Sequence, residues 1–385
     1  MLPPLSPREY PELDAAALDH VPLSRSETIP STWYTDPRFH ALDREAVFAR
    51  TWQLAGHLSR LGEPGAYVTA QVAGNPIIVV RGRDGVLRAF YNVCRHRGGP
   101  LALDAAGCVK ALQCKYHGWT YLLDGSLRGV PQWDRVELFE KGSFALVPVR
   151  LDVWEDFVFV SLAEDPPPLA EMMAGITERI LPTRLTTKTL VRRVDYEVHA
   201  NWKVYIDNYL EGYHVPYMHP DLATLLSFKD YRTESAAWQV LQHSPLSAED
   251  SVYASAEGGA GEAYYYWVFP NFMLNILPHR VQVNQVIPDG PDRCHVHFWY
   301  YYDDPESLKQ QQRIAADIAY SDAVQAEDRE ICERVQQGLS SRAYDRGRFS
   351  VEMEEGVWTF QRLLKQSYGA WVNASSHQPP ASSTR

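Results

Sequence analysis

The chain of 385 residues has few cysteines and no long apolar run. Its five cysteines are too sparse for a disulfide framework, and their odd number fits a reducing compartment in which thiols bind metal or lie buried. No run of about 18 apolar residues is present, so no membrane-spanning helix is predicted. The N-terminus lacks the charged and apolar segments of a secretory signal. These absences predict a cytoplasmic protein with no membrane partner.

The chain also lacks an excess of basic residues. It has 37 Lys and Arg against 48 Asp and Glu, a net charge of −11. This charge argues against nucleic acid or an anionic membrane as a partner, whereas a cationic small molecule or a basic protein is compatible with it. The hydrophobic content of 45% is that of a globular protein, and the length favours two domains.

The sequence pattern changes along the chain. Residues 1–45 read as an extended arm and a helix that pack on the domain formed by residues 166–372. Short alternating runs closed by Gly, Asp or Asn predict an all-β domain over 46–165, which ends before three consecutive prolines. Mixed strands and helices follow over 166–372, including one long helix near 306–337. The Pro/Ser-rich residues 373–385 are predicted to be disordered. The fold class is therefore α+β.

Two Cys/His pairs lie in the predicted β domain. Cys94 and His96 occur in "NVCRHRGGP", and Cys114 and His117 occur in "QCKYHGW" after 17 intervening residues. Each pair ends a strand and enters a turn, so two loops can present four ligands to one point. Two thiolates and two imidazoles suit zinc or an iron–sulfur cluster. A structural zinc site remains the competing interpretation, although the spacing departs from that of zinc fingers.

These two motifs resemble those of the Rieske domain, down to "YHGW" in the second. In a Rieske [2Fe–2S] cluster two histidines replace two cysteines on one iron. The resemblance implies that Cys94 and Cys114 hold one iron and that His96 and His117 hold the other. Cys108 lies between the motifs without a histidine partner and is interpreted as structural. A protein that only transfers electrons would explain this domain alone.

A second candidate metal site lies in "NWKVYIDNYLEGYHVPYMHP", residues 201–220. On an ideal helix His214 and His219 would be rotated about 140° apart and could not bind one ion. Pro216 should end or distort the helix near 212–216, so that the two histidines can meet. Two histidines and a carboxylate form the facial triad of non-haem Fe(II) sites, which leaves positions open for O₂.

The long C-terminal helix offers candidates for the carboxylate. Its acidic residues are Asp317, Asp322, Glu327, Asp328 and Glu330. Most are expected to face solvent. By helical phase, Asp328 shares a stripe with Val324, Ile331 and Val335, where a carboxylate is costly unless it is paired or bound to metal. Asp322, behind Ile318, is the second choice.

Together the motifs resemble the catalytic (α) subunit of Rieske non-haem iron oxygenases over nearly the whole chain. The resemblance implies a Rieske domain inserted in a helix-grip domain, in which an antiparallel sheet wraps a long helix. It implies Fe(II) on His214, His219 and Asp328, a homotrimer, and a separate flavin or iron–sulfur reductase that uses NAD(P)H. It also implies that Glu211 links the iron site to the Rieske histidine of a neighbouring subunit. Asn208 is a further candidate catalytic residue.

The glutamate in "DNYLEGYH", together with "STWYTDPRF" near the N-terminus, resembles the choline, betaine and carnitine branch of this family. Ring-hydroxylating members commonly have Asp at the position of Glu211. Quaternary ammonium cations are held by aromatic faces, and a subset of the aromatic residues in the catalytic region could supply them. These residues are Tyr205, Tyr209, Tyr213, Tyr264, Tyr265, Tyr266, Trp267 and Phe269. We therefore expect a monooxygenase that demethylates a betaine-like substrate or oxidises a choline-like one; an aromatic-ring hydroxylase is the alternative.

Overall fold

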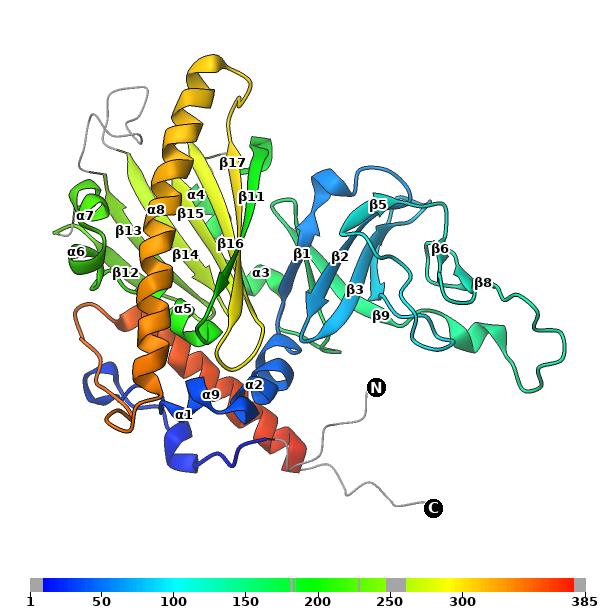
Figure 1. Cartoon of the computed structure of the whole chain (residues 1–385), viewed down its shortest axis with the longest axis horizontal. Coiled ribbons are helices and arrows are strands. Elements are labelled where there is room, and N and C mark those ends of the chain that lie inside the picture. The colour runs from blue at the N-terminus through cyan, green and yellow to red at the C-terminus, as the bar shows by residue number, and fades with distance from the viewer. Residues whose placement is uncertain (1–9, 181–182, 184, 228, 247–260, 377–385) are drawn as a thin grey trace. The chain divides into compact units, whose positions relative to one another are not determined.

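A computed structural model describes residues 10–180, 183, 185–227, 229–246 and 261–376 (Figure 1). The chain forms two compact units. One is Phe48–Glu171, and the other combines the segments before and after it. None of the described helices combines the length and the hydrophobicity needed to cross a bilayer. The predicted α+β class is confirmed. Along the chain, a β domain is followed by a domain with an antiparallel sheet and long helices.

The unit Phe48–Glu171 is built on an antiparallel sheet with the order β1-β10-β9-β4-β3-β2-β5. Its strands are β1 (Gln53–His57), β2 (Ala66–Val72), β3 (Asn75–Arg81), β4 (Leu87–Tyr91), β5 (Ala106–Cys108), β9 (Pro148–Trp154) and β10 (Phe157–Ser161). A smaller sheet contains β6 (Leu112–Gln113), β7 (Thr120–Tyr121) and β8 (Leu127–Gly129).

A tight hairpin shows how the sequence determines the register of this sheet. Strands β2 and β3 are joined by Ala73 and Gly74, which both have positive φ angles, 48° and 74°. Two such residues form the hairpin turn whose twist matches that of the strands, and Gly adopts this conformation without strain. The turn pairs Val72 with Asn75 and aligns the buried run from Ile77 to Val80 with the rest of the core.

The second unit contains an antiparallel sheet with the order β11-β17-β16-β15-β14-β13-β12. Its strands are β11 (Thr189–Val198), β12 (Arg232–Ser235), β13 (Gln239–Pro245), β14 (Glu262–Val268), β15 (Phe272–Leu277), β16 (Arg280–Pro288) and β17 (Cys294–Tyr302). The α-helices of the chain are α1 (Thr32–Thr35), α2 (Pro37–Leu42), α3 (Leu169–Met172), α4 (Ile176–Ile180), α5 (Trp202–Tyr209), α6 (Val215–Met218), α7 (Pro220–Leu225), α8 (Leu308–Leu339) and α9 (Glu355–Ser376). The long helix α8 runs across the sheet in Figure 1.

Helix α8 begins and ends close to the predicted positions, but its buried face is not the predicted apolar stripe. Ser307 caps its N-terminus by accepting a hydrogen bond from the backbone N–H of Gln310. The buried residues of the helix are Ile314, Asp317, Ser321, Gln325, Cys332, Gln336 and Leu339. Val335, assigned to the apolar stripe, is 42% exposed. Most of the buried face is polar because it meets polar groups of the sheet and of α5.

The termini of the described chain pack on the second unit. The ring of Tyr10 meets that of Trp371 on α9, with centroids 4.4 Å apart. Helix α9 was not predicted, and it continues to Ser376, so the first four residues of the tail expected to be disordered are helical. The rest of that tail, 377–385, and the start of the arm, 1–9, lie outside the described residues.

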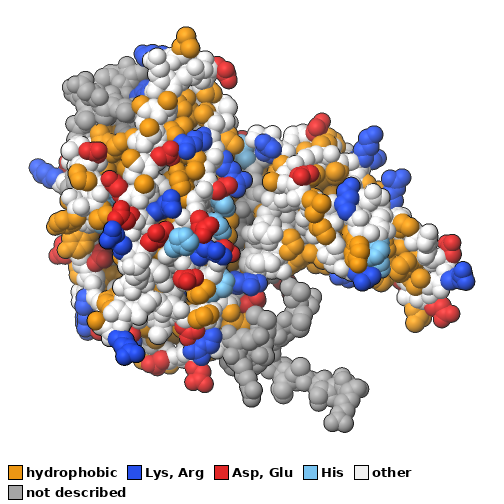
Figure 2. Space-filling view, viewed as in Figure 1, with side chains coloured by type: hydrophobic (Ala, Val, Ile, Leu, Met, Phe, Trp, Pro, Cys, Tyr) orange, Lys and Arg blue, Asp and Glu red, His pale blue; other side chains and the backbone are white. Residues whose placement is uncertain are grey.

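Acidic and basic side chains are interspersed over α8 and its neighbouring strands (Figure 2). Exposed ion pairs account for part of this pattern, such as Arg334 with Glu330 and Arg193 with Asp195. Ion pairs of this kind contribute little to stability.

Two candidate metal centres

The two Cys/His loops of the β domain have the same backbone conformation. Cys94 follows β4, and Cys114 follows β6. In each loop the carbonyl of the cysteine accepts a hydrogen bond from the N–H of the glycine four residues later, Gly98 or Gly118, at 3.0 Å. Both glycines have positive φ angles, 73° and 75°, which other residues rarely adopt. The loops therefore present Cys94 and Cys114 from equivalent positions, whereas His96 follows its cysteine by two residues and His117 follows its cysteine by three.

The structure brings the side chains of these loops together. Cys94 and Cys114 are buried in one core cluster. Burial raises the pKa of Cys94, and the neighbouring Cys114 thiol raises it further. The rings of His96 and His117 have centroids 4.8 Å apart. The imidazole of His96 stacks on Trp119 at 4.9 Å, and its buried Nδ1 has no hydrogen-bond partner within the described residues.

Two further residues shape the space around the thiols. The hydroxyl of Tyr121 lies 3.3 Å from Sγ of Cys94 and accepts a hydrogen bond from the backbone N–H of Arg95 at 3.0 Å. A Cβ atom at Gly99 would lie 2.8 Å from Sγ of Cys114, so the backbone approaches this thiol as only glycine allows. Two thiols, two imidazoles and an unpartnered buried nitrogen fit the ligand set of a Rieske cluster. Cys108, in contrast, is exposed at the end of β5.

The segment that carries His214 and His219 differs from the predicted helix. Helix α5 ends at Tyr209, earlier than expected, and a turn follows. His214 is the N-cap of the short helix α6, and His219 is its C-cap. Pro216 lies in the first turn of α6, where proline is tolerated, so it begins a new helix instead of ending the old one. The break between α5 and α6 is what allows the two imidazoles to face each other.

The structure brings the side chains of His214 and His219 close to that of Asp328 on α8. Nε2 of His219 lies 3.1 Å from Oδ1 of Asp328, and Nε2 of His214 lies 3.8 Å from the same oxygen. The candidate ligand atoms all lie within 4.8 Å of one another. One side-chain oxygen and two imidazole nitrogens at this spacing suit a facial triad for Fe(II).

Carboxylates contact the other nitrogen of each imidazole. Oε1 of Glu211 lies 2.5 Å from Nδ1 of His214, and its Oε2 accepts a hydrogen bond from the backbone N–H of His214 at 2.9 Å. Oε2 of Glu327 lies 2.6 Å from Nδ1 of His219. Such contacts fix the tautomer that leaves Nε2 available to a metal. Sequence reasoning missed the role of Glu327, and its position directly before Asp328 was the only available signal.

Asn208 and Asp322 have different relations to the site. Nδ2 of Asn208, on α5, donates a hydrogen bond to Oδ1 of Asp328 at 2.7 Å and so orients the candidate ligand. Asp322, the second choice for this role, instead accepts hydrogen bonds from Arg192 at 2.8 Å and Tyr196 at 2.6 Å.

The expectation that most of the other acids on α8 face solvent is wrong for Asp317. Its side chain is 4% exposed. It pairs with Arg280 at 2.9 Å and accepts a hydrogen bond from Tyr302 at 2.6 Å. Glu330 does face solvent, with a side chain that is 62% exposed.

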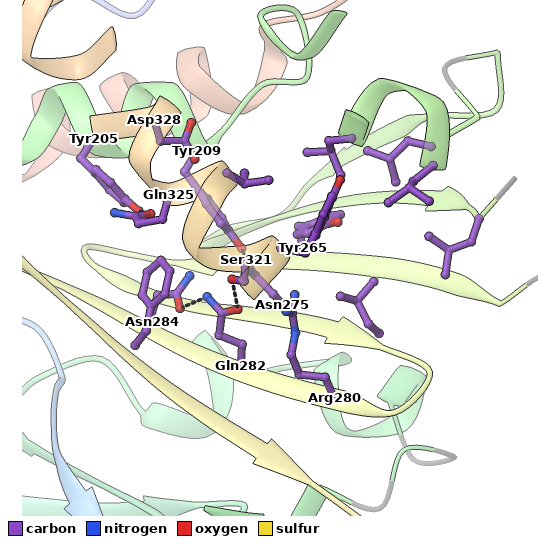
Figure 3. A pocket seen from close by; sticks show the side chains of 18 residues that line it. Tyr205, Tyr209, Tyr265, Asn275, Arg280, Gln282, Asn284, Ser321, Gln325 and Asp328 are labelled. Carbon is purple, nitrogen blue, oxygen red and sulfur yellow. Dashed lines mark hydrogen bonds between the residues drawn. The ribbon is translucent and has the colours of Figure 1, made fainter. Parts of the chain in front are cut away.

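Two adjoining cavities reach the candidate triad. One, of about 110 Å³, is lined by Glu211, His214, His219 and Asp328, and the other, of about 90 Å³, extends from Asp328 to Arg280 (Figure 3). We refer to them as the outer and the inner cavity. Tyr205, Tyr209 and Tyr265 line both cavities, and Tyr231 lines the outer one.

Hydrogen bonds fix the rings of three of these tyrosines. Their hydroxyls donate to Gln325 (Tyr205, 2.7 Å), Asn275 (Tyr209, 2.6 Å) and Gln242 (Tyr231, 2.8 Å). Burial raises the pKa of each hydroxyl, so the rings stay neutral. Of the aromatic residues singled out from the sequence, only Tyr205, Tyr209 and Tyr265 line these cavities, whereas Tyr213 is half exposed. Tyr231 was not predicted, because it follows α7 without a recognisable pattern.

Comparisons with known proteins agree with this geometry. A family model for the Rieske [2Fe-2S] domain matches residues 51–140, and one for the ring hydroxylating alpha subunit (catalytic domain) matches residues 185–370. Choline monooxygenase from Arabidopsis thaliana is 34% identical over 89% of this chain and 83% of its own length. The carnitine monooxygenase oxygenase subunit of Acinetobacter baumannii is 32% identical over 88% of this chain and 94% of its own length.

Comparison with solved structures gives the same result as the sequence comparisons. A quaternary ammonium Rieske monooxygenase superposes with a TM-score of 0.81 at 31% identity, over 90% of this chain and 96% of that one. Naphthalene 1,2-dioxygenase from Rhodococcus sp., at 19% identity and a TM-score of 0.74, shares the fold. The chain therefore belongs to the α subunits of the Rieske non-haem iron oxygenases. Within that family it is a monooxygenase of the quaternary ammonium branch.

Proposed function

We propose that this enzyme hydroxylates a carbon attached to the quaternary nitrogen of a small cationic substrate that binds beside His214, His219 and Asp328. The observation that carries the proposal is the set of tyrosine rings around the outer cavity. A trimethylammonium group has no N–H to donate, so aromatic faces, not ion-pair hydrogen bonds, hold it. Because hydrogen bonds already fix three of the rings, the pocket is preorganised and little conformational freedom is lost on binding.

We infer that Cys94, His96, Cys114 and His117 hold a [2Fe–2S] cluster and that the triad holds Fe(II). When bound, the cluster supplies single electrons and the Fe(II) supplies open positions for O₂. The residues around the triad hold its ligands in place. Glu211 and Glu327 keep a proton on Nδ1 of each imidazole.

The reaction on an N-methyl carbon balances as follows. O₂, two electrons and two protons convert the methyl group to N-hydroxymethyl and release water. The C–N bond then breaks, its electron pair stays on nitrogen, and formaldehyde and a proton leave, so the net result is N-demethylation. Hydroxylation of a choline-like carbinol carbon instead gives an aldehyde hydrate, which loses water. The electrons come from NAD(P)H through a separate flavin or iron–sulfur reductase, in keeping with the name "oxygenase subunit" of one relative.

We also propose a cytoplasmic homotrimer in which Glu211 of one subunit contacts His117 of the next. His117 is exposed, and Glu211 already contacts His214. The solved relative is described as having inter-subunit electron transfer. Mixed trimers of Cys114→Ser and His214→Ala chains should regain part of the activity. Adding Glu211→Ala to the Cys114→Ser chain should abolish this recovery. Inactive mixed trimers beside active wild-type trimers would show that transfer stays within one subunit.

The substrate class can be tested with purified enzyme, a reductase and NAD(P)H. We expect O₂ consumption and formaldehyde or aldehyde formation with members of a panel of betaines and choline. The matched control is 3,3-dimethylbutan-1-ol, in which carbon replaces the nitrogen of choline. Turnover of neutral arenes without any response to quaternary ammonium compounds would favour the aromatic-ring hydroxylase instead.

A further inference from the structure

Side-chain amides line both cavities, but they are used differently. In the outer cavity, Asn208 donates to Asp328 and Gln242 donates to the carbonyl of Tyr209, whereas the inner cavity adds further amides and the guanidinium of Arg280. Figure 3 shows the inner cavity between Asp328 and Arg280, with the amide side chains around it. Its polar lining residues, apart from Asp328 and the tyrosines, are Asn275, Arg280, Gln282, Asn284, Ser321 and Gln325. An amide can donate or accept hydrogen bonds, so the internal network decides which of these the cavity offers to a ligand.

Gln325 offers a donor. Its Oε1 accepts the hydrogen bond of the Tyr205 hydroxyl at 2.7 Å, and its Nε2 lies on the other side of the amide. The residue is 2% exposed, and its buried Nε2 has no hydrogen-bond partner within the described part of the chain. Buried polar atoms are nearly always hydrogen-bonded, so an N–H group without a protein partner beside a cavity is available to an acceptor in that cavity, either water or a ligand.

Two asparagines repeat this arrangement. Oδ1 of Asn284 accepts a hydrogen bond from Nε2 of Gln282 at 2.7 Å, and Oδ1 of Asn275 accepts one from the Tyr209 hydroxyl at 2.6 Å. In both side chains the amide oxygen is thus used inside the protein. A hydrogen bond donated by either side chain to a ligand in the cavity therefore comes from Nδ2.

The charged side chains also differ between the two ends of the cavities. The carboxylates that line the cavities, those of Glu211 and Asp328, lie at the candidate metal site. The guanidinium of Arg280 lines the far end of the inner cavity, where it pairs with the buried Asp317. A ligand therefore meets carboxylates at one end and a guanidinium with side-chain amides at the other, and tyrosine rings line both cavities.

We propose that the inner cavity binds the carboxylate of the substrate, which is then a zwitterionic betaine and not choline. This inference rests on the proposed function, because it assumes that the quaternary nitrogen lies beside the triad. The rise of helix α8 gives the approximate distances from Asp328 along the cavity. Gln325 precedes Asp328 by three residues, which is about 4.5 Å along the helix axis. Asp317, the partner of Arg280, precedes Asp328 by eleven residues, which is about 16 Å. A spacer of a few carbons therefore places the carboxylate at Gln325 and Asn284, short of Arg280.

The test uses 4-(trimethylammonio)butanoate, its methyl ester and choline, which share the cationic group but differ in the carboxylate. Binding to the holoenzyme is measured by calorimetry, and kcat/KM is measured alongside. We expect the wild type to bind the carboxylate at least about tenfold more tightly than the ester, as befits hydrogen bonds to a charged group.

The diagnostic variant is Gln325→Glu. It keeps an oxygen for the Tyr205 hydroxyl but replaces the N–H donor with a negative charge. We expect affinity for the carboxylate to fall at least about tenfold, while affinity for the ester and choline stays equal or rises. Gln325→Met, which removes the donor without adding charge, should cause a smaller loss for the carboxylate alone. Gln336→Glu is the matched control, because this buried glutamine of α8 instead accepts from the backbone N–H of Asn201 and should change none of these affinities.

Two results would overturn the inference. Equal wild-type affinity for ester and carboxylate would do so, as would an equal loss for all three ligands in both Gln325 variants. Either result would leave the proposed function standing if a quaternary ammonium compound still gave an oxidised product. If no quaternary ammonium compound bound or reacted, the proposed function and the present inference would both be overturned. Should Gln325→Glu fail to fold, Gln325→Met and Asn284→Asp make the same comparison.

Discussion

Replacing Glu327 by alanine removes the carboxylate that lies 2.6 Å from Nδ1 of His219. Loss of such a partner typically lowers metal affinity about 10- to 100-fold, or about 1.4–2.7 kcal/mol. The side chain of Glu327 is 44% exposed, so water can replace part of the contact, and we expect a loss near the lower limit, about tenfold. Glu327→Gln retains an oxygen that accepts from Nδ1 and should lose less.

The assay is titration of the iron-depleted triad with Fe(II) against a competing chelator, with the visible spectrum of the cluster as an internal reference. Glu330→Ala is the matched control, because Glu330 lies on the same helix but pairs with Arg334 at the surface. Unchanged Fe(II) affinity in Glu327→Ala, or an equal loss in Glu330→Ala, would refute a role for Glu327 in positioning His219.

Two further predictions concern other acids of this unit. Asp328→Ala should lose the mononuclear iron and keep the cluster spectrum, whereas Asp322→Ala should keep both; metal analysis giving the reverse would contradict the ligand assignment. Burial raises the pKa of Asp207 to about 7, so its contribution to stability is present below the unfolded-state pKa and is lost as the pH rises through 7. Asp207→Asn should therefore reduce the fall in unfolding free energy between pH 5 and pH 8 by about 2–3 kcal/mol, measured with denaturant, and parallel pH profiles would contradict this.

The candidate metal ligands could be predicted because they are local. Each Cys/His pair lies within one loop, and His214 and His219 lie within one turn and a short helix. Asp328 had to come from a distant helix, and helical phase selected it even though the supposed apolar stripe was wrong. Asp328 is partly exposed and follows the buried Gln325 by three residues, at the edge of the true buried face. Hydrophobic periodicity could not reveal that face, because most of its residues are polar.

The groups around the ligands were harder to predict. Glu327 contacts a histidine 108 residues earlier in the chain, and the amide oxygen of Gln325 binds a tyrosine 120 residues earlier. Nothing in the local sequence distinguishes these side chains from the exposed acids and amides of α8. Their roles depend on how α5, α6 and α8 pack together, and that packing follows from the fold of the whole second unit.

The most direct test of the account compares 4-(trimethylammonio)butanoate with 5,5-dimethylhexanoate, its isostere with carbon in place of nitrogen. Both have the same shape and the same carboxylate, so only the positive charge differs. With reductase and NAD(P)H, the ammonium compound should drive O₂ consumption and give one oxidised product per O₂, and the carbon isostere should give little of either. Equal turnover of the two compounds, or turnover of the isostere alone, would contradict the assignment of a quaternary ammonium substrate.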